Sequence, residues 1–252
     1  MLALTHLPSP RIADCLVTYV ERSAIDIDRA LRQHAAYCDA LRDYGAEVRT
    51  LNVNRNLPDS TFIEDTAVVL DDVALIARPG AAARRAETEG IETELRKYRP
   101  VERIAAPATL EGGDVLRVGG VLLVGLSSRT SPAGAAALDA VVRRFGYTVR
   151  TVPIHGCLHL KTACTALPDR RLLINRTWLD VEALRGFELI EVPAAEPFGA
   201  NIACLGERVL AGAEHAQTAD LIRGMGFELR TVELDEFAKA EGGVTCLSLL
   251  LA

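Results

Sequence analysis

A cysteine and a histidine in separate segments of the chain could together carry out a covalent hydrolysis. Cys246 follows two glycines near the carboxyl end, and His159 lies within residues 156–161. A cysteine is nucleophilic as the thiolate, which a neighbouring imidazolium or a bound cation favours. A histidine can protonate a leaving amine and then deprotonate the water that resolves a covalent intermediate. These two residues predict nucleophilic attack on an electrophilic carbon.

Carboxylates occupy two further segments that could contribute to the same chemistry. Glu64 and Asp65 end the segment 58–65, and Glu111 precedes the glycine pair 112–113. These carboxylates lack the spacing typical of metal ligands, whereas they suit a planar cation with N–H donors, which is a guanidinium. Glycine pairs let the backbone approach a ligand closely. We therefore expect the electrophilic carbon to belong to a guanidinium group.

Each of these residues alone has a simpler interpretation. A cysteine at a strand end usually belongs to the core, and adjacent carboxylates usually lie in a solvated loop. The cluster His155, Cys157 and His159, with Cys164 nearby, also admits a zinc site. We do not favour zinc, because alternate residues of one strand lack the usual paired-ligand geometry. The functional interpretation depends on the elements that position these side chains.

Three segments of the chain resemble one another and indicate an internal repeat. They are residues 44–51, 145–152 and 225–232, each with a glycine followed by a short alternating stretch. Two looser copies are residues 101–107 and 186–193. Each copy follows a stretch of helical character, and glycine is the residue that most readily ends a helix in the left-handed conformation. The pattern predicts helix, glycine and strand in succession, five times.

The repeat has a regular spacing. Taking Leu51, Ala106, Val152, Val192 and Val232 as equivalent points, the gaps are 55, 46, 40 and 40 residues. After these points come apolar hairpins at residues 66–77, 115–125, 162–175 and 202–211, and a lone strand at 245–251. The N-terminal strand near residues 1–5 would complete the last unit and close a ring.

This arrangement predicts an α/β protein, a five-fold pseudosymmetric α/β propeller built of ββαβ modules, with residues 1–252 as a single catalytic domain. The alternative is a doubly wound sheet, in which similar helix–glycine–strand transitions arise without five-fold symmetry. In the propeller, equivalent ends of the modules converge near the axis. The residues that would then share one pocket are Glu64, Asp65, Glu111, His159, Asn201 and Cys246.

The composition excludes several other classes of protein. Formal net charge is −6, with acidic and basic residues interleaved, so we expect neither nucleic acid nor a membrane as partner. No stretch reaches the roughly 18 apolar residues that span a bilayer, and we see no signal peptide. The six cysteines then predict reduced thiols and a cytoplasmic location.

Taken in order, the motifs resemble the dimethylarginine dimethylaminohydrolases, part of a superfamily that includes arginine deiminases and amidinotransferases. The resemblance spans nearly the whole chain. The motifs that carry it are Gln33-His34, PDSTFIED (58–65), RPGAAARR (78–85), LEGGD (110–114), GLSSRT (125–130), CLHLK (157–161), Ala200-Asn201 and GGVTC (242–246).

The resemblance implies a pentein-type propeller that hydrolyses asymmetric dimethylarginine and monomethylarginine to L-citrulline and dimethylamine or methylamine. It implies a covalent intermediate on Cys246, with His159 as acid and then base and Glu111 as the third catalytic residue, and neither a cofactor nor a metal. It also implies a homodimer. The residues that would bind the substrate are Glu111 and Asp65 at the guanidinium, Glu64 in support, Asp59 and the Ala240 backbone at the α-amino group, Arg84 and Arg129 at the carboxylate, and Leu16 in a lid loop.

Two segments depart from the family pattern. The arginine-bearing loop usually reads PGAPSRR, whereas residues 79–85 read PGAAARR, and loss of a proline should loosen the loop. The lid region 14–24 also differs, and lids contribute to substrate choice. Two rival functions therefore stay open: a deiminase-like hydrolase of free arginine, and a non-catalytic protein that binds arginine analogues.

Overall fold

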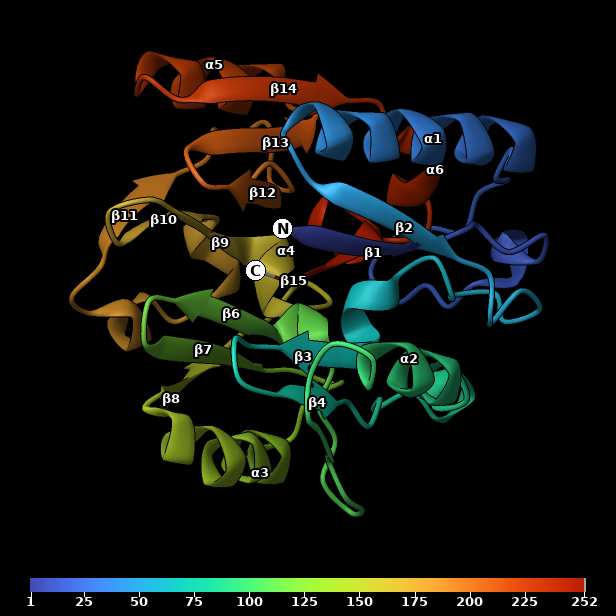
Figure 1. The fold of residues 1–252 in the computed structure, drawn as a ribbon. Helices are drawn as coiled ribbons and strands as arrows, with labels where there is room; N and C mark the ends of the chain where they lie inside the picture. Colours follow the sequence, from blue (N-terminus) through green and yellow to red (C-terminus); the bar gives the residue numbers. More distant parts are fainter. Residues whose placement is uncertain (252) are drawn as a thin grey trace.

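The computed structural model describes residues 1–251 and contains five three-stranded sheets arranged in a ring (Figure 1). In chain order from the first complete module, the strands are β3 (Ala67–Val69), β4 (Ala74–Ile76) and β5 (Val101–Arg103); β6 (Val115–Val118), β7 (Val121–Leu126) and β8 (Thr148–Pro153); β9 (Cys164–Leu167), β10 (Arg171–Ile174) and β11 (Glu188–Glu191); β12 (Ile202–Leu205), β13 (Arg208–Gly212) and β14 (Glu228–Val232); and β15 (Ser248–Leu251), β1 (Leu2–His6) and β2 (Glu47–Leu51).

Every sheet has the same topology. Its first two strands form an antiparallel pair, and the third runs parallel to the second. In the last sheet β15 pairs antiparallel with β1, with Leu251 opposite Leu2, so the two ends of the chain share one module. The predicted propeller and its closure by the N-terminal strand are confirmed, and the doubly wound sheet is excluded.

Helices on the outside of the ring link the second and third strands of four modules (Figure 1). They are α1 (Ile27–Asp43), α2 (Glu87–Leu95), α3 (Pro132–Val142) and α5 (Ala216–Gly224). The Asp26 side chain caps the first of them by accepting from the Arg29 amide. Gly45, Gly146 and Gly226 follow three of these helical connections with φ between +84° and +90°, as the repeat predicted.

The remaining module, which the structure describes in full, has no such helix, although the repeat predicted a helix before each repeated segment. Between β10 and β11 lie two 3₁₀ turns, η6 (Arg176–Trp178) and η7 (Val181–Leu184). Asn175 accepts from the Thr177 amide and Asp180 from the Glu182 amide, so each side chain begins its own short turn. Two caps so close together favour two turns over one continuous helix.

The core lies between each sheet and its outer covering, and the inner strands contact one another around the axis. Tyr37 and Leu41 of α1 are fully buried, and the Tyr37 hydroxyl is 2.8 Å from the Ser248 hydroxyl on β15. Burial of one such large apolar side chain contributes about 1.5–3 kcal/mol. The rigid ring thus fixes the loops at its ends, which carry the candidate site.

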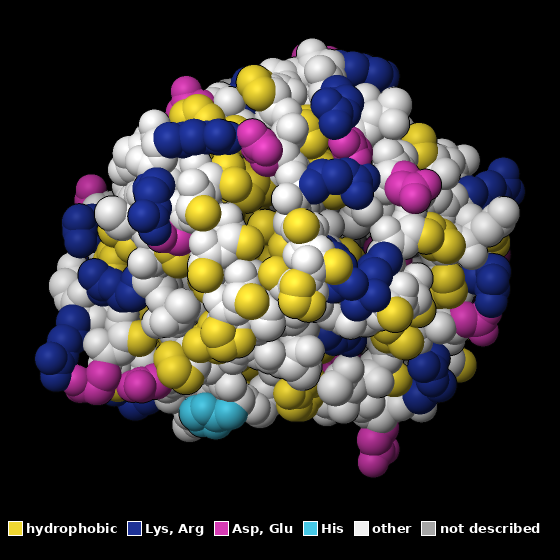
Figure 2. All heavy atoms as spheres, turned by 90° about the horizontal axis from the view of Figure 1, so that it is seen from below, with side chains coloured by type: hydrophobic (Ala, Val, Ile, Leu, Met, Phe, Trp, Pro, Cys, Tyr) yellow, Lys and Arg dark blue, Asp and Glu magenta, His cyan; other side chains and the backbone are white. Residues whose placement is uncertain are grey.

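The outer surface of the ring carries mixed side chains. On the face shown in Figure 2, hydrophobic side chains form a band, and basic and acidic side chains lie interspersed around it. This distribution agrees with the interleaved charges of the sequence. Within residues 1–251, no helix is both long and apolar enough to cross a membrane.

Candidate active site

The candidate catalytic residues lie at the entrances of hairpins in four modules. Asp65 belongs to η2 (Ile63–Thr66), which leads into β3. Glu111 precedes η4 (Gly112–Asp114) and β6, and His159 precedes α4 (Leu160–Ala163) and β9. Cys246 lies in η8 (Thr245–Leu247), which leads into β15. Corresponding ends of the modules therefore bring these residues together, as the repeat predicted.

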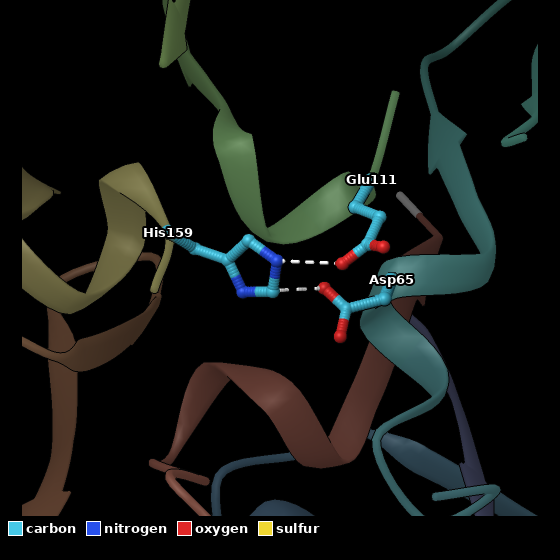
Figure 3. A group of neighbouring side chains, drawn as sticks. All are labelled: Asp65, Glu111 and His159. Carbon is cyan, nitrogen blue, oxygen red and sulfur yellow. Dashed lines mark hydrogen bonds and ion pairs between the residues drawn. The ribbon is translucent and has the colours of Figure 1, made fainter. Parts of the chain in front are cut away.

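His159 is held between two carboxylates (Figure 3). Its Nε2 lies 2.7 Å from Oε2 of Glu111, and its Nδ1 lies 3.7 Å from Oδ1 of Asp65. Burial alone would lower the pKa of His159, but Asp65, Glu111 and the nearby Asp114 outweigh it and raise this pKa to about 9. At neutral pH the ring is an imidazolium, which can give a proton to a leaving group.

Glu111 is fully buried and ionised. Burial favours the neutral acid, but the bond from His159 and the nearby arginines lower the pKa of Glu111 to about 2. Its second oxygen, Oε1, accepts from the Gly80 amide at 3.1 Å and lies 3.5 Å from Nη1 of Arg129. Glu111 therefore orients His159 and links it to the arginine-bearing loops.

Asp114 fixes the backbone beside His159. Its Oδ1 accepts from the Leu160 amide at 2.9 Å, and its Oδ2 accepts from the Ser127 hydroxyl at 2.6 Å. Gly113 lies against the ring, because a Cβ atom there would come 2.7 Å from Nδ1 of His159. Gly113 therefore lets the backbone lie directly against the catalytic ring. Asp114 ends the LEGGD motif, but the motif alone does not indicate its contact with the Leu160 amide.

Cys246 is partly buried, and its Sγ accepts from the Gly243 amide at 3.4 Å. Burial raises the pKa of this thiol to about 12, and the carboxylates of Glu64 and Asp65 act in the same direction. With no ligand bound, Cys246 is therefore a thiol at neutral pH. A positive charge placed beside Sγ would stabilise the thiolate.

Glu64 lies behind the site. Its carboxylate accepts from Nζ of Lys161 at 2.6 Å and from the Thr245 hydroxyl at 2.7 Å. Asn201 joins the same network, since its Oδ1 accepts from the Thr245 amide at 3.1 Å. Glu64, Lys161 and Thr245 line a separate cavity of about 270 Å³. Lys161 belongs to the CLHLK motif, but no feature of the sequence indicates that it pairs with Glu64.

The cavity at Cys246 also receives the five residues assigned to the rest of the substrate. They are Leu16, Asp59, Arg84, Arg129 and Ala240, and His159 and Asp65 also line the cavity. Glu111 and Glu64 are absent from this lining. The cavity holds about 20 Å³, room for about one water molecule, so this closed form cannot hold an arginine derivative.

The two arginines differ in how their donors are used. Arg84 is buried and already bonded to Asp65 at 2.5 Å and to Glu87 at 2.8 Å. Removing it would leave the buried carboxylate of Glu87 without its charged partner and take one partner from Asp65, a loss of about 3–5 kcal/mol in stability. Nη1 of Arg129 is buried and makes no hydrogen bond in the described part of the chain, although it lies 3.5 Å from Oε1 of Glu111. Arg129 therefore offers the freer donor to an anion.

The residues that could bind a metal ion are His159 and the two carboxylates that contact it. Ligand atoms of Asp65, Glu111 and His159 lie within 4.8 Å of one another, and they form the one such group among residues 1–251. The alternative zinc cluster does not assemble, because Cys157 and Cys164 lie outside this group. Sγ of Cys157 points to the carbonyl of His159 instead.

Comparison with known proteins gives a consistent result. Residues 18–166 match the family model described as "N,N dimethylarginine dimethylhydrolase, eukaryotic". The chain is 43% identical to N(G),N(G)-dimethylarginine dimethylaminohydrolase of Streptomyces coelicolor over 99% of this chain and 96% of that protein. It is 36% identical to the enzyme of that name from Pseudomonas aeruginosa, over 89% of each.

A solved structure from Pseudomonas aeruginosa has the same fold. It is a cysteine-to-serine mutant of the dimethylarginine dimethylaminohydrolase complexed with citrulline. The TM-score is 0.93 at 34% sequence identity, with 98% of this chain and 97% of that chain covered. The similarity thus extends over the whole ring, including every module that contributes to the site.

Proposed function

The chain belongs to the dimethylarginine dimethylaminohydrolase family, and we propose that it hydrolyses Nω-methylated arginines to L-citrulline and dimethylamine or methylamine. One observation supports this proposal above the others. An imidazolium held by two carboxylates lines the same cavity as a cysteine thiol. Acid, anions and nucleophile are what hydrolysis of a guanidinium requires.

Binding of the substrate uses both ends of the cavity. The guanidinium lies between Cys246 and the carboxylate of Asp65, both of which line the cavity and the second of which accepts its N–H groups. In the opened cavity, Glu111 also accepts from the guanidinium. At the other end, Asp59 and the Ala240 backbone receive the α-amino group. The carboxylate binds the free donor of Arg129, with Arg84 beside it, and Glu64 supports Cys246 through Thr245. Leu16 closes over the substrate in the lid.

Attack begins once the substrate cation is in place. The bound guanidinium lowers the pKa of Cys246, and the thiol proton passes to solvent. The Sγ thiolate then bonds to the guanidinium carbon and forms a tetrahedral adduct. His159 gives its proton to the methylated nitrogen, and the C–N bond breaks as the amine departs. A thiouronium bonded to Cys246 remains.

Hydrolysis of this intermediate uses His159 a second time. Now neutral, the ring takes a proton from a water molecule as its oxygen attacks the thiouronium carbon. The remaining hydroxyl proton passes to the departing sulfur as the C–S bond breaks, and citrulline and the Cys246 thiol are released. Glu111 keeps the ring in position for both steps through its 2.7 Å contact with Nε2.

The raised pKa of Cys246 predicts a strong difference between neutral and cationic alkylating reagents. Below a pKa of about 12 the thiolate fraction grows about tenfold per pH unit. Alkylation by neutral chloroacetamide should therefore be slow at pH 7 and rise about tenfold per unit up to pH 9. The cation chloroacetamidine has the same shape and should react roughly 100-fold faster at pH 7. Peptide mass spectrometry locates the label, and a chloroacetamide rate that levels off near pH 7 would show a preformed thiolate.

The rival substrate, free arginine, differs in the leaving amine. A comparison of citrulline formation from asymmetric dimethylarginine and from arginine tests the proposal directly. A non-catalytic binding protein would form citrulline from neither. We expect the methylated substrate to be preferred.

We also propose that residues 1–252 act as one catalytic domain, because Glu111, His159 and Cys246 come from three different modules. A cytoplasmic location fits six cysteines that are all free thiols. The homodimer rests on the family resemblance, and sedimentation of the purified protein measures it.

A further inference from the structure

Leu16, in the segment 15–22, lines the cavity at Cys246, and so does a loop after α6 (Asp235–Ala238). In that loop Glu241 lies between Ala240 and Gly242, and all three line the cavity. Both carboxylate oxygens of Glu241 accept backbone amides of the covering segment. The amide of Thr18 lies 2.8 Å from Oε2 and that of Tyr19 lies 2.5 Å from Oε1. Charged acceptors make hydrogen bonds of this kind stronger than neutral ones.

Glu241 adopts a backbone conformation that glutamate disfavours. Its φ is +61°, in the left-handed region, and among residues 1–251 only Asp169 and Arg170 share this property without being glycine. Glycine would occupy the position without strain. A strained residue at a site loop suggests that its side chain has a function there. The structure shows what the side chain does, since it binds the covering segment.

The other contacts of this segment use groups that the proposed function assigns to the substrate. The Leu16 amide donates to Oδ1 of Asp59 at 3.1 Å, and Nη2 of Arg129 donates to the Thr18 hydroxyl at 3.3 Å. An α-amino group and a carboxylate in the cavity would compete with the segment for both side chains. The two bonds to Glu241 have no such competitor.

We propose that Glu241 is a positioning residue that latches the lid, residues 15–22, over the bound substrate. That the lid closes over a bound substrate rests on the proposed function, whereas the attachment of the lid by Glu241 does not. The cavity of about 20 Å³ requires the lid to open for entry. Glu241 and the lid residue Val20 also line a neighbouring cavity of about 270 Å³, so release of the latch opens the wall between the two. Glu241 then closes the lid again.

Limited trypsin digestion of the protein without substrate tests the latch. The lid carries one cleavage site, Arg22, whose exposed side chain binds the carbonyls of Ala13 and Cys15. In Glu241→Gly, both bonds to the lid are lost and the backbone strain is relieved. We expect cleavage after Arg22 to be faster by about tenfold or more, with an unchanged or higher urea midpoint. Glu241→Gln keeps one acceptor and should lie between this variant and the wild type.

Asp169→Gly is the matched control. Asp169 also has a left-handed backbone conformation, with φ at +59°, and glycine relieves its strain in a turn outside the lid. It should cleave at the wild-type rate. With dimethylarginine, Glu241→Gly should raise KM about tenfold and change kcat by less than about threefold. Wild-type cleavage rates in both Glu241 variants would overturn the latch. Faster cleavage together with a wild-type protein that forms no citrulline would uphold the latch and refute the proposed function.

Discussion

Replacement of Cys246 by serine is expected to abolish citrulline formation while dimethylarginine still binds. A serine hydroxyl is a far weaker nucleophile than a thiolate, and a bound guanidinium cannot ionise it at neutral pH. Loss of a covalent nucleophile lowers turnover by about 10⁴-fold or more. The change removes little volume, so the cavity should keep its shape. Citrulline assay and calorimetric titration with dimethylarginine measure the two effects separately.

Cys204 offers a matched control for that variant. It is the other cysteine that is partly exposed, and its Sγ donates to the Ala166 carbonyl away from the site. Cys204→Ser should keep turnover within about threefold of the wild type. If Cys246→Ser retained a tenth of wild-type turnover, the assignment of the nucleophile would be wrong.

Replacement of His159 by glycine should lower turnover of dimethylarginine by about 10²–10⁴-fold, since an amine cannot leave without a proton. A substrate whose leaving group is a thiol needs no such acid. With an S-alkylthiocitrulline the variant should therefore complete the first step and lack the base for the second. A covalent adduct on Cys246 should accumulate and be visible by mass spectrometry of the intact protein.

His155 serves as the control for this experiment, because it is exposed and lies four residues before His159. His155→Gly should turn over both substrates at nearly the wild-type rate and accumulate no adduct. Rapid turnover by His159→Gly, or no adduct with the thiol-leaving substrate, would contradict the double role of the ring.

The sequence was sufficient to predict the ring because its signals are local and repeated. Gly45, Gly146 and Gly226 each follow a helical connection, and alternation of apolar residues marks the strands. Five-fold symmetry then placed His159 and Cys246 at equivalent hairpin entrances. The failure between β10 and β11 has a local cause as well. The capping side chains Asn175 and Asp180 begin two separate turns.

The parts of the site that escaped prediction depend on contacts between distant residues. Lys161 meets Glu64 across 97 residues of sequence, and Glu241 meets Thr18 across 223. The sequence spacing of neither pair indicates that its two residues are in contact. Arg84 was assigned to the substrate by its motif, whereas its bonds to Asp65 and Glu87 give it a structural task visible only in three dimensions.

The most direct test of the proposed chemistry is a comparison of kcat/KM for citrulline formation from asymmetric dimethylarginine and from arginine, with the purified wild-type protein. We predict a higher value for dimethylarginine, with one dimethylamine released per citrulline. A higher value for arginine, with release of ammonia, would contradict the proposed substrate.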